Sequence, residues 1–308
     1  MSGDPAGALP GTLYVVATPI GNLGDVTLRA IEVLRAVPLI AAEDTRLTRR
    51  LLERHAIATR TTSYHARSDP RREEELLEHL RGGGDLALVT DAGTPLVSDP
   101  GEGLVAAWAA QDGRVVPIPG ASSVLAAVMA SGVAGPRWSF EGFLPRSGRE
   151  RRERLARIAA DERGAVVFEA PSRVAATLRD LAAACDEARP AAVCRELTKL
   201  HESIVRGSLG SLAAAATDGT IRARGEFVLV VGSGSAREDA TGAEAALTAA
   251  RDAVERMVDE GVARGDAARR VAADTGLPRR SLYAAPQDDL PGAAPGDRPA
   301  QSREMEDR

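Results

Sequence analysis

Carboxylate, imidazole and ammonium groups follow several short apolar runs of this sequence. Glu43 and Asp44 follow "PLIAA", His65 follows "TTSY", and Glu196 and Lys199 follow "AAVCR". The carboxyl ends of parallel strands meet at one edge of a sheet, where open α/β proteins bind their ligands. A carboxylate, imidazole or amine at that edge could accept a proton from a substrate hydroxyl. These five residues are the candidate bases, and the sequence does not choose among them.

Lys199 is the only lysine in the chain, and more than one role fits it. Desolvation between neighbouring arginines would lower its pKa and make it a proton acceptor, but it could equally clamp a phosphate or lie on the surface. His65 has an imidazole suited to base chemistry, although a single histidine is more often a structural residue. Arg46 and Arg195 are expected to clamp phosphate or carboxylate groups, with the neighbouring glutamates as ion-pair partners.

Four loops at the ends of expected strands carry small residues, prolines and acids. They read "TPIGNLGD" (18–25), "EDTR" (43–46), "TDAGTPLVSDPG" (90–101) and "PGASS" (119–123). Glycine lets the backbone of such a loop approach a ligand closely. None has the GxGxxG spacing of dinucleotide sites, so a nicotinamide cofactor is disfavoured. No Walker A motif with its lysine occurs, which excludes a P-loop nucleotide hydrolase.

Short β-branched runs alternate with amphipathic helical stretches up to residue 232, which predicts an α/β fold with a mainly parallel sheet. In the first half we expect strands at 12–18, 38–43, 61–65, 85–90 and 114–119, and helices at 25–37, 46–55, 71–81 and 122–131. In the second half we expect strands at 164–170, 191–197 and 225–232, and helices at 148–161 and 173–184. A turn-rich segment separates the last two strands.

Composition divides the chain into six segments. We expect a disordered leader (1–11), an N-terminal α/β domain (12–134), a C-terminal α/β domain (135–232), a flexible linker (233–242), a helical domain (243–285) and a disordered tail (286–308). Three helices are expected in the helical domain, where "DAARRVAADTGLPRRSLY" has the glycine turn of a helix-turn-helix. A helical cap without any nucleic-acid role fits the same pattern.

Arginine supplies nearly all of the positive charge and gathers at 46–50, 67–72 and 146–157. The net charge of −5 argues against a protein that coats nucleic acid with its whole surface, but it allows a local basic patch. Arg149 and Arg152 lie in the densest cluster, which is either an RNA contact or a solvated helix face. Two cysteines without metal-ligand spacing, and no apolar run of ~18 residues, indicate a reduced cytoplasmic protein with no metal site and no membrane span.

Taken together and in order, the motifs resemble one enzyme family. The segments "TLYVVATPIGNLGD", "AAEDTR", "SYH", "ALVTDAGTPLVSDPG", "PGAS", "EGFLPR", "FEAPSR", "CRELTK" and "GEFVLVV" are similar to the small-subunit ribosomal RNA cytidine 2′-O-methyltransferases of the tetrapyrrole methylase superfamily. The resemblance covers about residues 12 to 232. It implies a two-domain class III methyltransferase fold with an appended small helical domain, S-adenosyl-L-methionine as methyl donor, and a homodimer. The implied acceptor is a cytidine ribose in the decoding centre of 16S ribosomal RNA in the small subunit.

The same resemblance implies which residues hold the methyl donor. They are Pro19, Asp91, Thr94, Ser122 and Ser123 in the first domain, and Phe168 and Leu197 in the second. Other roles are open: the Asp91 side chain could form an Asx turn, and Ser122 could cap the following helix. The sequence departs from the family in "PGASS", where "PGPSA" is commoner, and at Arg67 and Ser68, where a histidine and an asparagine are usual.

Two other functions remain open at this point. One is a small-molecule tetrapyrrole (precorrin-type) methyltransferase on the same scaffold, which would need neither the arginine clusters nor the terminal helices. The other is a ligand-sensing regulator that binds nucleic acid through the terminal helices. A test for methyl transfer to ribosomal RNA distinguishes these two alternatives from the ribosomal RNA methyltransferase that the motifs favour.

Overall fold

The computed structural model describes residues 9–66, 68–234 and 236–282. The chain forms two compact units, 1–237 and 238–308. Most of the expected leader and all of the expected tail lie outside the described residues. Among the described residues, no helix is long and apolar enough to cross a membrane.

The first half of the first unit is a parallel sheet, as predicted. Its strand order is β3-β2-β4-β1-β5, and every neighbouring pair is parallel. The strands are β1 (Thr12–Val16), β2 (Leu39–Ala42), β3 (Arg60–Ser63), β4 (Leu86–Val89) and β5 (Arg114–Ile118). The connecting helices are η1 (Leu23–Asp25), α1 (Leu28–Ala36), α2 (Thr45–Arg54), α3 (Pro70–Arg81), α4 (Glu102–Ala109) and α5 (Ser123–Ser131). Helix α4 was not expected from the sequence.

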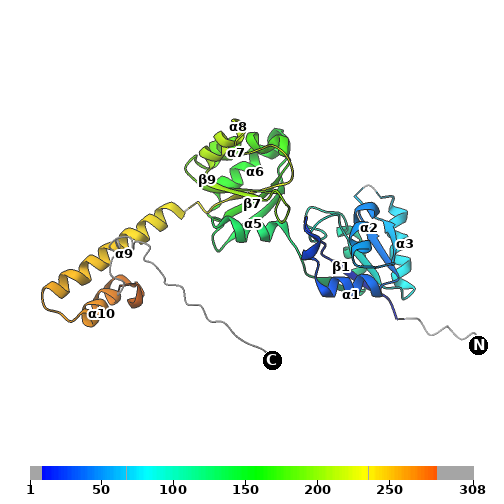
Figure 1. Cartoon of the computed structure of the whole chain (residues 1–308), viewed down its shortest axis with the longest axis horizontal. Helices are drawn as coiled ribbons and strands as arrows, with labels where there is room; N and C mark the ends of the chain where they lie inside the picture. The colour runs from blue at the N-terminus through cyan, green and yellow to red at the C-terminus, as the bar shows by residue number, and fades with distance from the viewer. Residues whose placement is uncertain (1–8, 67, 235, 283–308) are drawn as a thin grey trace, which may run out of the picture. The chain divides into compact units, whose positions relative to one another are not determined.

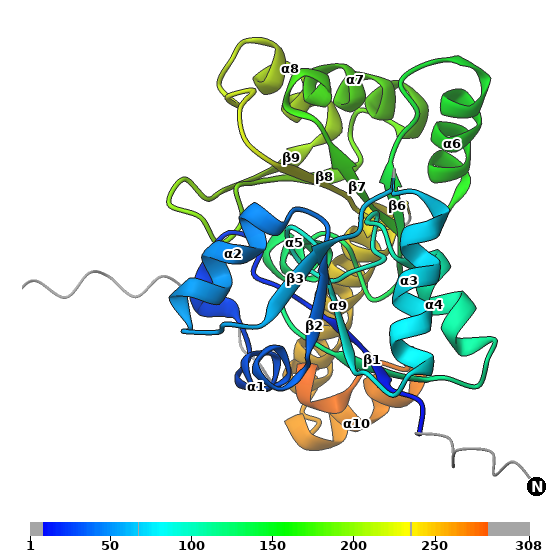
Figure 2. The same ribbon diagram turned by 90° about the vertical axis from the view of Figure 1, so that its right-hand side faces the viewer.

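Alternate residues of the central strands supply two separate cores. Ala87 and Val89 of β4 face the layer that contains α1 and α2, whereas Leu86 and Leu88 face the layer that contains α3 and α4. All four β4 residues are buried, because a parallel sheet is covered on both faces. Figure 2 shows these two helix pairs on opposite sides of the sheet.

The second half is a mixed sheet, which corrects the expectation of parallel strands. Its order is β6-β7-β10-β8-β9, in which only β6 and β7 are parallel, and β10 runs antiparallel to both of its neighbours. The strands are β6 (Trp138–Phe143), β7 (Gly164–Glu169), β8 (Pro190–Arg195), β9 (Ser203–Ser208) and β10 (Phe227–Val231), with helices α6 (Gly148–Ala160), η2 (Pro171–Arg173), α7 (Val174–Cys185) and α8 (Leu209–Thr217). Strand β6 was unforeseen, and the expected turn-rich segment contains β9 and α8. Strand β9 can follow β8 directly because an antiparallel pair needs only a short connection.

Helix α5 joins the two halves. Val124 and Ala127 of α5 share one apolar cluster with Val228 and Val230 of β10 and with Cys194 of β8. Figure 1 shows α5 beside β7, on the sheet face that α6, α7 and α8 leave open. The loop before α5 leaves the carboxyl end of β5, so that edge of the first sheet lies next to the second sheet.

The second unit is a small helical bundle. It contains most of α9 (Ala236–Asp259), together with α10 (Arg264–Thr275) and η3 (Arg279–Leu282), and Ala250, Val254 and Val271 lie in its core. Helix α9 begins at Ala236, within the segment expected to be a linker. The third expected helix is a single 3-10 turn as far as the structure describes it, and residues 283–285 lie outside the described residues.

A buried arginine ties the second sheet to its helices. Arg189 is 5% exposed, and its guanidinium donates to the carbonyl oxygens of Gly232 (2.8 Å), Ile158 (3.2 Å), Asp161 (3.2 Å) and Arg163 (3.0 Å). Only a forked guanidinium reaches acceptors on several segments at once.

We expect Arg189→Ala to lower the free energy of unfolding by about 3 kcal/mol, because buried carbonyl groups lose their donors. Urea denaturation followed by tryptophan fluorescence measures this, since both tryptophans lie in the first unit. Arg179→Ala, which removes an exposed arginine of α7, is the matched control and should change stability by less than about 0.5 kcal/mol. Equal losses for the two variants would contradict the structural role of Arg189.

Candidate functional site

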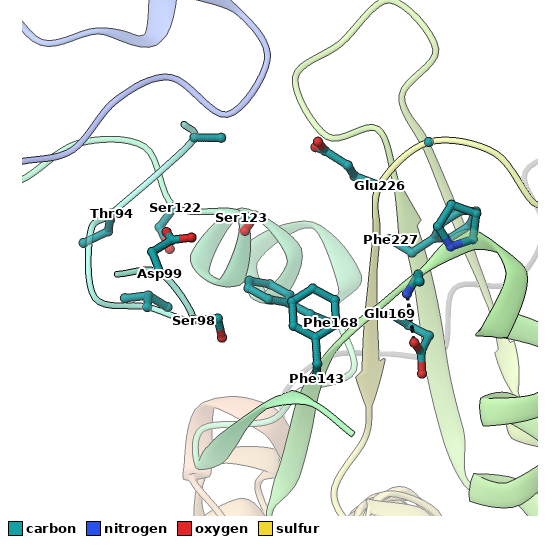
Figure 3. Close-up of a pocket in the computed structure, with 15 residues that line it drawn as sticks. Thr94, Ser98, Asp99, Ser122, Ser123, Phe143, Phe168, Glu169, Glu226 and Phe227 are labelled. Carbon is teal, nitrogen blue, oxygen red and sulfur yellow. Dashed lines mark hydrogen bonds between the residues drawn. The ribbon is translucent and has the colours of Figure 1, made fainter. Parts of the chain in front are cut away.

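A cavity of about 370 Å³ lies between the strand-end loops of the first sheet and the second sheet. Thr94, Ser98, Asp99, Ser122 and Ser123 line it from the first half, and Phe143, Phe168, Glu169, Glu226 and Phe227 line it from the second. Figure 3 shows these two sets of side chains facing one another. Thr94, Ser122, Ser123 and Phe168 were predicted as site residues, and the structure brings them together.

The loop that follows β4 forms one wall. Thr18 and Gly93 exchange backbone hydrogen bonds of 2.8 and 3.0 Å, which hold this loop against the loop after β1. The Thr94 hydroxyl donates to the Ala121 carbonyl at 3.2 Å. Leu96 (φ 72°) and Ser98 (φ 69°) adopt left-handed backbone conformations, which are strained for residues other than glycine. Such strain clusters at functional sites, and Ser98 lines the cavity.

Ser122 has the capping role that the sequence left open, and it also lines the cavity. Its Oγ accepts a hydrogen bond from the backbone N–H of Leu125 at 3.4 Å, at the N-terminus of α5. The partial positive charge of this helix end therefore faces the cavity through Ser122 and Ser123.

The opposite wall is aromatic and acidic. Phe168 contacts Phe140 and Phe143 edge to face, with ring centroids 4.9 and 5.5 Å apart. The buried Glu169 carboxylate accepts hydrogen bonds from the Thr177 hydroxyl at 2.6 Å and from the Ala170 N–H at 2.8 Å. It is also ion-paired with Arg173 at 3.1 Å. Glu169 is thus a fixed part of the wall.

Carboxylates gather in the loops around the first wall, and one of them, Asp99, lines the cavity. The Asp91 Oδ1 accepts from the Asp44 N–H at 2.9 Å, and the Asp91 N–H donates to Glu43 Oε2 at 3.4 Å. Burial raises the pKa of both Glu43 and Asp91. Burial, together with the negative charge of Glu43, raises the pKa of Asp99 to about 6. Asp91 therefore organises the turn before α2 rather than an Asx turn in its own loop.

Asp44, the neighbouring carboxylate, is paired with an arginine. Hydrogen bonds from Arg46 lower the pKa of Asp44 to about 2, and the two side chains form an ion pair of 2.7 Å. The Arg46 side chain is 86% exposed. Arg46 is paired with Asp44 instead of the expected glutamate, but its guanidinium lies open to solvent.

Lys199 closes the edge of the cavity through ion pairs. Its Nζ lies 3.0 Å from Glu196 Oε1 and 2.8 Å from Glu226 Oε2. Burial alone would lower its pKa, but the hydrogen bonds to the two carboxylates outweigh burial, so the pKa of Lys199 is raised. Of the roles left open for Lys199, the one that needs a lowered pKa is therefore wrong, because the sequence did not reveal Glu226 as a partner.

The loop that carries Lys199 also contacts the first half. The Thr198 hydroxyl accepts from the Asn22 N–H at 3.2 Å. A Cβ added to Gly21 would lie 2.4 Å from Lys199 Cγ, so only glycine allows this close approach.

Several predicted site residues lie outside the cavity lining. Pro19 is buried, and Leu197, which is 7% exposed, packs in the apolar cluster beside Phe168. Asp91 lies one residue before Ala92, which does line the cavity. His65 lies in a separate hollow, where the Ser68 hydroxyl accepts its backbone N–H at 2.8 Å.

The predicted RNA-contacting arginines lie in different surroundings. Arg149 is 85% exposed and pairs with Glu153 on the same face of α6, and Arg152 is exposed on that helix. Arg195 donates through Nε to the Arg224 carbonyl at 2.6 Å and through Nη1 to the His201 carbonyl at 3.3 Å.

The sequence reasoning missed Asp99, Phe143, Glu169 and Glu226. Asp99 belongs to the "SDPG" end of the loop that drew attention, but only the fold places it in the cavity. Glu226 stands before β10 in "GEFVLVV" and carried no signal of its own. Among the described residues, no group of three or more histidine, cysteine, aspartate or glutamate side chains could hold a metal ion.

Known proteins are similar to this chain in sequence and in fold. The Tetrapyrrole (Corrin/Porphyrin) Methylases family profile matches residues 12–213. A Synechocystis sp. protein named "Ribosomal RNA small subunit methyltransferase I" is 46% identical over 273 residues, covering 89% of this chain and 96% of its own. A protein of the same name from Micromonospora olivasterospora is 45% identical, covering 91% and 87%. The uroporphyrin-III C-methyltransferase of Thermus thermophilus, solved with S-adenosylhomocysteine, shares the fold at 19% identity, with a TM-score of 0.52 and coverage of 72% and 97%.

The raised pKa of Asp99 predicts a pH-dependent stability. A carboxyl whose pKa is raised on folding holds its proton more tightly in the folded state, so the contribution of Asp99 to stability falls as the pH rises from about 4 through about 6. Asp99→Asn removes this penalty. We expect the variant to be about 1 kcal/mol more stable than wild type at pH 7.5, after allowance for solvent screening, with the difference shrinking toward pH 4.

Urea denaturation of both proteins across this pH range measures the effect. Asp112→Asn, at an exposed turn position, is the control and should show no such trend. A stability difference for Asp99→Asn that does not change with pH would refute the raised pKa.

Proposed function

The chain belongs to the tetrapyrrole (corrin/porphyrin) methylase family, and we propose that it methylates ribosomal RNA. The proposed reaction transfers a methyl group from S-adenosyl-L-methionine to the ribose 2′-hydroxyl of a cytidine in the decoding centre of 16S ribosomal RNA. One observation carries the proposal: a single cavity is walled by both α/β halves, and its walls are built from the family's motifs. The names of relatives that are 45–46% identical support the acceptor.

The cavity suits the chemistry of the proposed methyl donor. The edge-packed rings of Phe143 and Phe168 offer an apolar surface for a purine. Asp99 and Glu226 are carboxylates that favour the cationic sulfonium and ammonium groups. The N-terminus of α5 offers N–H groups to a carboxylate. When bound, S-adenosylmethionine supplies an electrophilic methyl group.

The seven residues predicted to contact the methyl donor divide into two groups. Thr94, Ser122, Ser123 and Phe168 are proposed to touch the donor. Three others are proposed to position the lining: Pro19 and Asp91 through the neighbouring loops, and Leu197 by packing near Phe168.

The residues of the first wall are proposed to activate the ribose hydroxyl. A hydroxyl is a weak nucleophile until its proton leaves, and a nearby base contributes about 10²-fold or more. Asp99 lines the cavity with a pKa of about 6, so it is ionised at neutral pH and basic enough to accept that proton. Glu43 is proposed to maintain this pKa through its negative charge. Lys199 and Glu196 are proposed to hold the edge of the cavity, and His65 to lie beyond the reacting groups.

The partners follow from the proposed reaction. The acceptor is the small ribosomal subunit, which places the protein in the cytoplasm, and Arg46, Arg149, Arg152 and Arg195 are proposed RNA contacts. A homodimer is proposed as well. Leu125 and Met129, one turn apart on α5, are 52% and 82% exposed, and a second copy would cover them.

The direct test is methyl transfer. We expect the full-length protein, given labelled S-adenosylmethionine and small subunits that lack the modification, to label one ribose in the decoding centre; mapping the labelled nucleotide identifies the site. Subunits that already carry the modification are the control and should take up no label. Label on a base, on tetrapyrroles alone, or nowhere would reject the proposed reaction.

A binding experiment tests the electrostatic part of the site. The sulfonium of S-adenosylmethionine is positive, whereas the thioether of S-adenosylhomocysteine is neutral. We therefore expect Asp99→Asn to weaken binding of the first about 5-fold and of the second less than 2-fold, by calorimetry. Asp112→Asn should affect neither. Equal weakening of both ligands by Asp99→Asn would exclude a charge interaction with the sulfonium.

A further inference from the structure

We propose, resting on the function above, that a second hollow binds the RNA backbone beside the target nucleotide. This hollow has a volume of about 710 Å³ and lies between the loop that joins β8 to β9 and the segment 220–225. Arg195, Arg222 and Arg224 line it. The ligand class is the sugar–phosphate backbone of single-stranded RNA.

The hollow adjoins the cavity. Gly225 lines both, and Glu226, the next residue, lines the cavity. Gly225 has a φ of 95°, and a Cβ there would lie 2.6 Å from the Glu196 carboxyl group, so glycine lets Glu196 pack directly against the backbone at this boundary. Because the two spaces share Gly225, a bound strand can place one ribose at the cavity and its neighbours in the hollow.

The hollow has a net positive charge, because its lining contains three arginines and two glutamates. Glu196 pairs with Lys199, whereas Glu202 accepts the uncharged Thr198 N–H at 2.6 Å and keeps its negative charge. Within the described part of the chain, Arg195, Arg222 and Arg224 form no ion pair. Arg222 and Arg224 are exposed, so their guanidinium groups are available to phosphates.

Arg195 is held ready for such a contact. Its hydrogen bonds to the Arg224 and His201 carbonyls fix the guanidinium without neutralising its charge, because carbonyl oxygens are uncharged. A fixed fork loses little conformational entropy when it binds a phosphate. Leu200, which also lines the hollow and is 93% exposed, offers apolar surface to an unstacked base or ribose.

Helix α6 carries the arginine cluster that the sequence offered as an RNA contact, but several of its arginines are engaged in ion pairs. Arg149, Arg151 and Arg154 pair with Glu153, Asp180 and Glu141. Arg152 therefore stands on a helix whose neighbouring arginines are mostly neutralised. The hollow, by contrast, gathers unpaired arginines next to the reacting centre.

The test uses the full-length double variant Arg222→Ala/Arg224→Ala with small ribosomal subunits that lack the modification. We expect the KM for subunits to rise at least about 10-fold while kcat stays within about 2-fold, because the reacting groups are untouched. The slope of log affinity against log salt should fall by about 1 to 2, as expected when about two phosphate contacts are lost. Calorimetric affinity for S-adenosylhomocysteine should not change.

Three comparisons make the result specific. Arg60→Ala/Arg114→Ala removes the same charge from exposed arginines at the amino ends of β3 and β5, and should leave the KM unchanged. Arg222→Lys/Arg224→Lys should recover part of the lost affinity. Arg149→Ala/Arg152→Ala should have the smaller effect. A larger effect from this last pair, with wild-type KM and salt slope for the hollow variant, would overturn the inference.

The proposed RNA site and the proposed reaction can be rejected independently. Sedimentation binding of the variants to subunits is measured without methyl transfer, so an unchanged affinity of Arg222→Ala/Arg224→Ala rejects the hollow whatever the enzyme activity. A wild-type protein that binds subunits but labels no ribose rejects the proposed reaction instead.

Discussion

The packing of α5 against the second sheet is the contact on which the site depends. One end of this helix carries Ser122 at the carboxyl edge of the first sheet, while Val124 and Ala127 lie in the core beneath β8 and β10. The same helix is therefore a wall of the cavity and the join between the halves. This packing fixes the relation between the strand-end loops and the aromatic wall, and the cavity takes its lining from both halves.

Two neighbouring spaces of opposite charge follow from this arrangement. The cavity is lined by Asp99 and Glu226, which suit a cationic methyl donor, whereas the hollow beyond Gly225 is lined by three arginines, which suit a polyanion. The ion pairs of Lys199 with Glu196 and Glu226 stand between them. These ion pairs keep Lys199 charged and bound to the two glutamates, at the boundary between the acidic cavity and the basic hollow.

The sequence predicted the first half well because its signals are local. Apolar runs, the "TDAGTPLVSDPG" loop and the serine before α5 each act within a few residues. The second sheet was harder, because strand direction depends on pairing across the fold: β10 lies between β7 and β8, which no periodicity reveals. The roles open to Lys199 could not be narrowed from the sequence for the same reason, since its partner Glu226 is distant in sequence. Asp99 stood in the right motif, but its burial beside Glu43 is a tertiary property.

The left-handed residues Leu96 and Ser98 carry a consequence for protein engineering. Each holds a backbone conformation that costs about 1–3 kcal/mol for a side chain with a Cβ, and glycine would relieve it. A search for greater thermal resistance would therefore select glycine at these two positions. That gain in stability would come with a more flexible backbone in the loop that lines the cavity. Thermal stability and an ordered ligand site therefore make opposite demands on this loop.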